Sequence, residues 1–229
     1  MAKLLGMQVD ACMIDLDGTL VDTMGDFDAV VAQMLQVLKL PALPRSELQG
    51  MVGKGSEYLI EAVLTRQLAL PGQSGLAPTQ EMLALAWDIY QKHYAHVNGQ
   101  FSQIYPGVLK GLQGLSALGL PLVCLTNKPA ALAQSLLQLK GLESFFTLTF
   151  GGDSFERKKP DPLPLLKTCE ALGVHPDRAL MVGDSSNDAQ AAQAAGCKVV
   201  LLTYGYNHGR PARQVPADHH LDSLTQLLD

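Results

Sequence analysis

Short runs of mostly apolar residues alternate along most of the chain with stretches in which apolar residues recur every three or four positions. Runs of the first kind are typical of strands buried on both faces, and stretches of the second kind are typical of amphipathic helices. The expected strands are residues 11–16, 120–126, 145–150, 179–184 and 198–203, and the expected helices are residues 108–118, 130–139, 162–172 and 187–195. This alternation predicts an α/β fold with a Rossmann-like core, in which helices cover both faces of a doubly wound parallel sheet.

Residues 23–97 depart from this alternation, because their apolar positions follow helical periodicity and no strand is expected among them. The expected helices lie at about residues 27–38, 59–64 and 78–94, with a loop rich in Gly and Pro at residues 71–78. Trp87 and the Met and Tyr residues of these helices are expected to form their core. Since this stretch directly follows the first strand, it should cover the carboxyl ends of the strands, where open α/β sheets bind ligands. We therefore expect a catalytic core of residues 1–20 and 99–229, with an inserted all-helical cap domain of residues 21–98.

The composition narrows the class of partner. Of the 229 residues, 47% are hydrophobic and 17% are charged, the net charge is -5, and no stretch concentrates Lys and Arg. These values argue against a nucleic acid or an acidic membrane as the partner and favour a small solute. The four cysteines lie far apart along the chain, so we expect free thiols in a reducing compartment. With no apolar run suited to a signal peptide or a membrane span, we expect a cytoplasmic monomer or small homo-oligomer.

The strongest chemical signal is the segment DLDGTLVDT, residues 15–23, at the end of the first expected strand. Asp15 and Asp17 are two positions apart, so both carboxylates should leave the strand end on the same side, and Gly18 allows the chain to turn sharply. Acidic residues and Gly after a strand also form ordinary turns, so this segment alone does not establish a site.

Three further segments carry groups suited to phosphate or to a metal ion. They are LTNKP at residues 125–129, with a hydroxyl and an amide, KKPDP at residues 158–162, with a lysine pair, and VGDSSNDAQAA at residues 182–192, with Asp184 and Asp188. Each also has an ordinary interpretation, as a helix N-cap, a solvated surface charge or a partner of a helix dipole. All of them nevertheless follow an expected strand or lead into an expected helix, so they should meet at one edge of the sheet.

As a set, these segments resemble the motifs of the haloacid dehalogenase-like superfamily, and the resemblance covers essentially the whole chain. Within that superfamily the sequence is most similar to the bacterial phosphoglycolate phosphatases. The narrower resemblance rests on the segments above together with GGD at residues 151–153, AAGC at residues 194–197 and LTYGYN at residues 202–207. It implies a phosphatase of a small phosphorylated metabolite, with 2-phosphoglycolate as the expected substrate and Mg²⁺ as the cofactor.

The resemblance also implies roles for individual residues. Asp15 matches the nucleophile that forms an aspartyl-phosphate, and Asp17 matches the residue that protonates the leaving oxygen and later activates water. The residues matched to phosphate binding are Thr126, Asn127 and Lys159. Lys159 is preferred over Lys158 because it directly precedes a proline, as the family pattern requires.

A metal site follows from the same resemblance. Mg²⁺ would be held by Asp15, the backbone carbonyl of Asp17 and Asp184, with Asp188 in the outer shell and Asn187 as a neighbour. Carboxylates gathered around a phosphate repel one another by about 4 kcal/mol per pair at about 4 Å and an effective dielectric of about 20. A cation is needed to offset that repulsion.

The helical stretch also contains Gly53, Lys54 and Gly55, which match in form the short Gly-x-Gly loop of the family's helical cap. The two glycines permit close approach of the backbone to a ligand. Lys54 is then a candidate for pairing with the carboxylate of a substrate such as 2-phosphoglycolate, so these three residues form a candidate specificity loop. A lysine solvated at a loop tip is the alternative, and both interpretations stay open.

Other functions are compatible with the same core. They are a phosphatase for a sugar or amino-sugar phosphate, a phosphomutase, and a catalytically silent binding or regulatory protein. Every charged group that the superfamily pattern requires is present, which argues against a silent protein. Turnover of p-nitrophenyl phosphate with Mg²⁺ would separate an enzyme from a binding protein.

Overall fold

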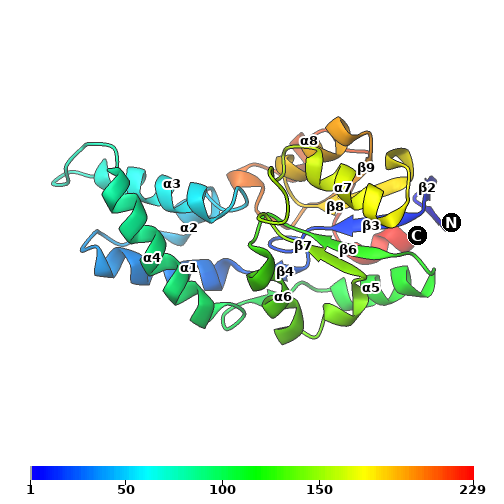
Figure 1. The fold of residues 1–229 in the computed structure, drawn as a ribbon, viewed down its shortest axis with the longest axis horizontal. Helices are drawn as coiled ribbons and strands as arrows, with labels where there is room; N and C mark the ends of the chain where they lie inside the picture. The colour runs from blue at the N-terminus through cyan, green and yellow to red at the C-terminus, as the bar shows by residue number, and fades with distance from the viewer. Residues whose placement is uncertain (1) are drawn as a thin grey trace.

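A six-stranded parallel sheet forms the centre of the fold, and helices cover both of its faces (Figure 1). The computed structural model describes residues 2–229. In spatial order the strands are β10 (His219–Leu221), β9 (Lys198–Leu202), β8 (Ala179–Gly183), β3 (Ala11–Ile14), β6 (Leu122–Leu125) and β7 (Leu148–Phe150). The predicted doubly wound parallel sheet is confirmed, and every strand predicted from an apolar run is present.

Alternate residues of the strands enter two separate apolar clusters, one on each face of the sheet. The covering helices are α5 (Val108–Ala117), α6 (Ala130–Leu139), α7 (Leu163–Leu172) and α8 (Ser186–Ala195). In β3, Cys12 and Ile14 pack in the cluster that includes α5 and α6, whereas Met13 packs in the cluster that includes α7 and α8. Because successive side chains of a strand point to opposite faces, a strand covered on both sides is apolar throughout. This is why the apolar runs predict the strands correctly.

Four helices that lie between β3 and α5 in the chain form a separate layer to one side of the sheet (Figure 1). They are α1 (Met24–Val37), α2 (Arg45–Gln49), α3 (Ser56–Leu68) and α4 (Gln80–Val97). These helices share an apolar core of their own, which includes Met34 from α1, Val63 from α3 and Tyr90 from α4. The sequence predicts α1, α3 and α4. It does not predict α2, because so short a helix shows no apolar periodicity.

Two short strands connect this helical layer to the sheet. β4 (Val21–Asp22) precedes α1, β5 (Gln103–Ile104) follows α4, and the two pair antiparallel. Beside them, the buried carboxylate of Asp26 accepts hydrogen bonds from the backbone N–H groups of Gly99 at 2.8 Å and Phe101 at 2.7 Å. The segments through which the chain enters and leaves the helical layer are therefore fixed to each other.

Smaller elements complete the fold. β1 (Ala2–Leu4) and β2 (Met7–Val9) form an antiparallel hairpin. Short 3-10 helices lie at Glu143–Phe145, Pro176–Arg178, Asn207–Gly209, Ala212–Gln214 and Leu224–Leu228. The sequence does not predict β1, β2, β4, β5 or β10, because strands of two or three partly exposed residues carry no distinct apolar pattern.

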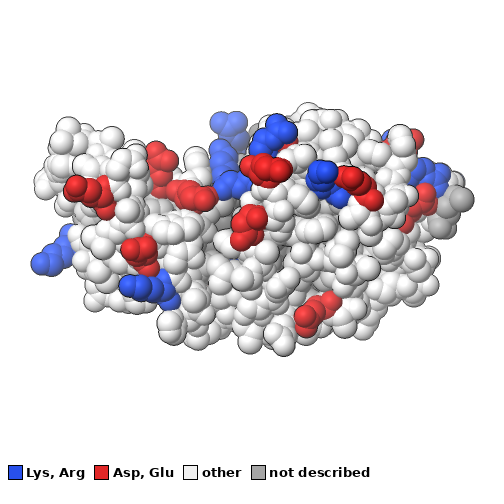
Figure 2. All heavy atoms as spheres, viewed as in Figure 1, with Lys and Arg blue, Asp and Glu red and all other residues white. Residues whose placement is uncertain are grey.

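Acidic and basic side chains are interspersed on the face of the molecule shown in Figure 2, which has no continuous basic area. All four cysteines are free thiols, as the sequence predicts, and all four are buried. Over residues 2–229, no helix combines the length and the apolar character needed to cross a bilayer.

Candidate active site

The polar segments singled out in the sequence meet in one cavity, at the carboxyl ends of the parallel strands. Its lining includes Asp15, Asp17, Thr126, Lys159 and Asp184 from the sheet side, and Phe27, Leu59 and Tyr94 from the helical layer. The cavity therefore lies between the sheet and the helical layer. This is where ligands of open α/β sheets bind.

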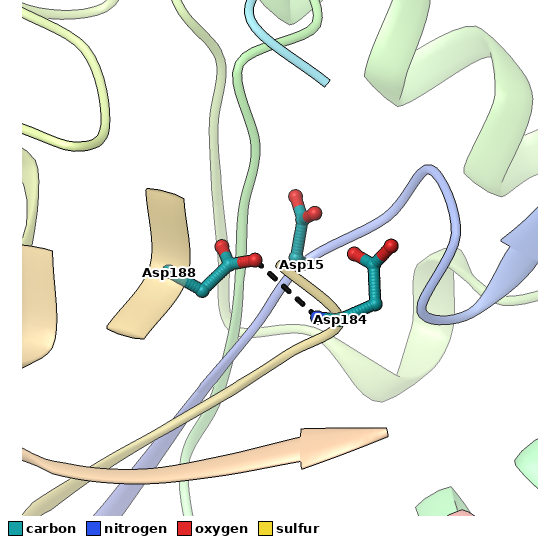
Figure 3. A group of neighbouring side chains, drawn as sticks. All are labelled: Asp15, Asp184 and Asp188. Atoms are coloured by element: carbon teal, nitrogen blue, oxygen red, sulfur yellow. Dashed lines mark hydrogen bonds between the residues drawn. The ribbon is translucent and has the colours of Figure 1, made fainter. Parts of the chain in front are cut away.

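Three buried carboxylates lie close together in this cavity (Figure 3). Asp15 follows β3, Asp184 follows β8 and Asp188 lies in the first turn of α8, and one oxygen of each lies within 4.8 Å of the others. Oδ2 of Asp188 accepts hydrogen bonds from the backbone N–H of Asp184 at 3.3 Å and from the hydroxyl of Ser185 at 2.8 Å. Asp188 therefore both caps the start of α8 and belongs to the carboxylate cluster.

Asp184 is held from two further segments of the chain. The hydroxyl of Thr19 donates to Oδ1 at 3.1 Å, and the backbone N–H of Tyr206 donates to Oδ2 at 2.6 Å. Gly18, in the turn after Asp17, has a φ of +86°, and a Cβ at that position would lie 2.4 Å from Oδ2 of Asp184. Only glycine fits this turn, as the sequence predicts.

Lys159 is the cation at the centre of the cluster. Its Nζ lies 3.0 Å from Oδ1 of Asp15 and 2.6 Å from Oδ1 of Asp188, and it donates to the carbonyl oxygen of Leu125 at 2.7 Å. Burial lowers the pKa of this ammonium group, but the two carboxylates outweigh burial and raise the pKa above its usual range. Lys159 is therefore charged, and its ammonium group contacts Asp15, Asp188 and the carbonyl oxygen of Leu125.

The electrostatics of the carboxylates favour a bound cation. Burial raises the pKa of Asp15 to about 7, Lys159 opposes this rise, and the charges of Asp188 and Asp17 add to it. Burial also raises the pKa of Asp184 well above its usual range, and the charges of Asp188 and Asp15 add smaller contributions in the same direction. Buried carboxylate oxygens that repel one another suit a hard divalent cation such as Mg²⁺, which neutralises them. Asp15, Asp184 and Asp188 thus fit a metal site.

The carboxylate of Asp17 pairs with a different lysine. Nζ of Lys128 lies 3.3 Å from Oδ1 of Asp17 and donates a hydrogen bond to the hydroxyl of Tyr94. The side chain of Lys128 is 1% exposed. Asp17 therefore has a separate ionic partner, within the same cavity as the carboxylate cluster.

The backbone at Gly53 reaches the cavity from the helical layer. Its carbonyl oxygen accepts hydrogen bonds from Nδ2 of Asn127 at 3.2 Å and from Nδ2 of Asn187 at 3.0 Å. Gly53 and Gly55 both line the cavity, with φ values of 108° and 96° that favour glycine. The two asparagines therefore bind the glycine loop to the carboxyl ends of β6 and β8.

Two lysines near this loop lie outside the cavity lining over the part of the chain described. Nζ of Lys54 lies 4.8 Å from the centroid of the Tyr58 ring. Nζ of Lys158 lies 2.6 Å from Oε2 of Glu57. The structure thus brings Gly53 and Gly55 to the site, while the charge of Lys54 is directed to a neighbouring aromatic ring.

Comparison with known proteins agrees with this architecture. Residues 12–202 match the family of haloacid dehalogenase-like hydrolases, which is most of the chain. The chain belongs to this family. The resemblance inferred from the motifs is therefore confirmed, and this haloacid dehalogenase-like hydrolase is an enzyme, as the sequence predicts.

Relatives of this haloacid dehalogenase-like hydrolase match nearly its full length. It is 39% identical over 224 residues to the phosphoglycolate phosphatase of Thiobacillus denitrificans, covering 98% of this chain and 96% of that relative. It is 41% identical over 218 residues to the phosphoglycolate phosphatase of Nitrosospira multiformis, covering 95% and 93%. The crystal structure of a predicted phosphoglycolate phosphatase from Haemophilus somnus superposes with a TM-score of 0.91 at 32% identity, covering 97% of both chains.

Sequence reasoning misses several residues at the site. Thr19 and Tyr206 lie in two of the segments on which the family resemblance rests, so that resemblance could have placed them near the site. Lys128 follows Asn127 in the LTNKP segment, but a lone lysine in a loop gives no sign of burial. Tyr94 is expected only as a core residue. It is buried in the core of the helical layer, as expected, and it also lines the cavity.

Proposed function

We propose that this enzyme is a Mg²⁺-dependent phosphatase that hydrolyses a small phosphomonoester, 2-phosphoglycolate, through an aspartyl-phosphate formed on Asp15. The observation that carries the proposal is the contact of Asp15 with Lys159 inside a cluster of buried carboxylates. A carboxylate nucleophile beside a fixed cation suits attack on a phosphoryl group, because the cation offsets the charge of the oxygens around phosphorus. The names of the relatives support a phosphatase and favour 2-phosphoglycolate as the substrate.

In the first half-reaction a carboxylate oxygen of Asp15 bonds to phosphorus while the ester P–O bond breaks. Asp17 gives its proton to the leaving oxygen, so the product departs as an alcohol. Asp17 then takes a proton from water, and the resulting nucleophile attacks phosphorus and breaks its bond to Asp15. The phosphoryl oxygens are bound through both steps by Lys159 and Thr126, and Asn127 lies beside them.

Asp15, Asp184 and the backbone carbonyl of Asp17 would hold Mg²⁺, with Asp188 in the outer shell and Asn187 nearby. The bound ion supplies positive charge that neutralises the carboxylates and the phosphoryl oxygens. Lys159 complements the ion, because its ammonium group already contacts two of the carboxylates. The acidic cluster is therefore compatible with a dianionic substrate.

We also propose the division of labour between two domains. Residues 1–20 and 99–229 would form the catalytic core, and residues 21–98 would form a cap that excludes water from the cavity. The cytoplasmic location and the monomer or small homo-oligomer stay predictions.

The test is hydrolysis of p-nitrophenyl phosphate by the purified protein, followed by a panel of phosphate esters that includes 2-phosphoglycolate and sugar and amino-sugar phosphates. We expect turnover with Mg²⁺, its loss in EDTA, its return on adding Mg²⁺, and poor support by Ca²⁺, whose looser coordination misplaces the nucleophile. Phosphate release is the readout. Full activity in metal-free buffer would contradict the mechanism, and no turnover of any ester would point to a binding protein. A higher kcat/KM for a sugar phosphate than for 2-phosphoglycolate would identify the sugar phosphate as the substrate. Isomerisation without phosphate release would indicate a mutase.

A further inference from the structure

Lys128 is a buried lysine in the cavity that none of the steps above uses. It lies two positions after Thr126, at the carboxyl end of β6, and its side chain is 1% exposed. Its ammonium group lies 4.4 Å from the ring centroid of Tyr94 and 5.4 Å from that of Phe27, both on helices of the cap. Burying an ammonium group is costly unless it is paired, so the position of Lys128 has to be explained by the groups it binds.

The hydrogen-bond partners of the Lys128 ammonium leave part of its capacity unused. Within residues 2–229 they are Oδ1 of Asp17, at 3.3 Å, and the hydroxyl of Tyr94. An ammonium group has three N–H donors, so one is left to bind a ligand in the cavity. Lys159 differs, because its ammonium group contacts two carboxylates and a backbone carbonyl of the core.

The hydroxyl of Tyr94 adds a second donor beside the first. It accepts the hydrogen bond from Lys128, so its own proton is directed elsewhere. Burial raises the pKa of Tyr94 well above its usual range, which keeps that proton in place. An ammonium group and a phenol side by side can donate to the two oxygens of one carboxylate, and the rings of Tyr94 and Phe27 exclude the water that would weaken these bonds.

The position of this pair of donors relative to the reaction decides what it binds. In the proposed mechanism Asp17 gives its proton to the leaving oxygen, so the leaving oxygen lies beside Asp17. The ammonium group of Lys128 contacts the carboxylate of the same aspartate. In 2-phosphoglycolate a single methylene separates the ester oxygen from the carboxylate carbon. The geometry points to Lys128, assisted by the Tyr94 hydroxyl, as the residue that binds the carboxylate of the substrate. This inference rests on the proposed function and restricts the substrates to small phosphomonoesters with a second anionic group close to the ester oxygen.

Lys54 is the rival for this role. Its ammonium group lies over the Tyr58 ring and its side chain does not line the cavity among the residues described, whereas its neighbours Gly53 and Gly55 do. The loop therefore contributes backbone groups to the cavity. The cation comes from Lys128, on the core.

The experiment compares Lys128→Met with the wild-type enzyme on two substrates, 2-phosphoglycolate and 2-phosphoglycolamide, in which an amide replaces the carboxylate. Methionine keeps the length and the apolar stem of the lysine and removes its charge. We expect the ratio of kcat/KM for the acid to that for the amide to fall by about 10- to 100-fold, mainly through KM. Lys54→Met is the matched control, which should change this ratio by less than about twofold.

Tyr94→Phe is the second variant, and it keeps the test decisive if Lys128→Met does not fold. It removes one donor and retains the ring, so the ratio should fall in the same direction by about three- to tenfold.

Equal losses on the acid and the amide, in either variant, would overturn the role of Lys128, since they indicate an effect exerted through Asp17 or the fold. A fall in the ratio with Lys54→Met instead would overturn it as well. If the wild-type enzyme hydrolyses p-nitrophenyl phosphate but does not prefer the acid to the amide, the role of Lys128 fails while the phosphatase stands. If it hydrolyses no ester, the proposed function itself fails.

Discussion

Lys159 and Asp15 form an ion pair, with Nζ of the lysine 3.0 Å from Oδ1 of the aspartate. The same ammonium group is also fixed by Asp188 and by the carbonyl oxygen of Leu125. The pair therefore aligns the side chain proposed as the nucleophile with the cation proposed to hold the phosphoryl group. An enzyme that depends on such alignment gains rate from preorganised charge rather than from movement during the reaction.

The first prediction is that Asp15→Asn abolishes turnover and leaves the fold intact. The amide has nearly the shape of the carboxylate but is a poor nucleophile, so kcat should fall by more than about a thousandfold. Hydrolysis of p-nitrophenyl phosphate measures the loss, and circular dichroism checks the fold. Asp10→Asn is the control, because Asp10 lies just before the same strand at its other end, where it pairs with Arg178 at 2.9 Å. Activity of Asp15→Asn within about tenfold of wild type would exclude it as the nucleophile.

The second prediction separates the roles of Asp17 and Asp184. Asp17→Asn should lower kcat by about a hundredfold or more, through loss of acid–base catalysis, and leave the affinity for Mg²⁺ nearly unchanged. Asp184→Asn should weaken Mg²⁺ binding by about tenfold or more, because it removes a charged oxygen from the metal site. Calorimetric titration of each variant with Mg²⁺ gives the affinities directly. An equal loss of affinity in both variants would show that the Asp17 side chain is itself a metal ligand.

The third prediction concerns the stability of the metal-free protein. Burial raises the pKa of Asp15 from 3.8 to about 7, so between these values the folded protein keeps a proton that the unfolded chain has released. The free energy of unfolding should therefore decrease as the pH rises through this range. Melting temperatures in EDTA at pH 5 and pH 7.5 measure this decrease. Mg²⁺ should make the decrease smaller by stabilising the protein at pH 7.5. Asp15→Asn should also make it smaller without abolishing it, because the pKa of Asp184 is raised as well. A slope in the variant as steep as in wild type would assign the effect to other groups.

The fourth prediction concerns the junction of the cap with the core. Asp26→Ala removes the buried acceptor of two backbone N–H groups, those of Gly99 and Phe101, and should lower the free energy of unfolding by about 2 to 4 kcal/mol. Asp28→Ala on the same helix is the control. Asp28 is partly exposed and pairs with Arg45 at 3.2 Å, so its loss should cost less than about 1 kcal/mol. Urea denaturation compares the two, and equal effects would mean that Asp26 does not fix the junction.

The sequence predicts the sheet and the positions of the clustered carboxylates for the same physical reason. Strands covered on both faces must be apolar, so the point at which polarity returns marks the strand end. Asp15 and Asp184 lie at such points on neighbouring strands, β3 and β8, and the parallel arrangement brings both to one edge.

What the sequence does not predict depends on contacts between distant segments. Lys128 has the sequence environment of a surface lysine, and it is buried because Tyr94 and Phe27, on two cap helices, cover it. From the sequence, Lys54 is the stronger candidate for binding the substrate carboxylate, because glycines flank it. Local sequence does not determine in which direction its side chain extends. Helix periodicity marks Tyr94 as buried and does not show that the buried face borders a cavity.

The pairing of β4 with β5 restricts how the cap can move. Val21 pairs with Ile104 and Asp22 with Gln103, so both connections between cap and core run through one narrow ribbon. Two connections joined by backbone hydrogen bonds have to bend together, which leaves rotation about an axis across the ribbon as the motion that breaks fewest bonds. The cap is therefore expected to rotate about a single hinge. Substrate entry and phosphate release then both depend on that one rotation.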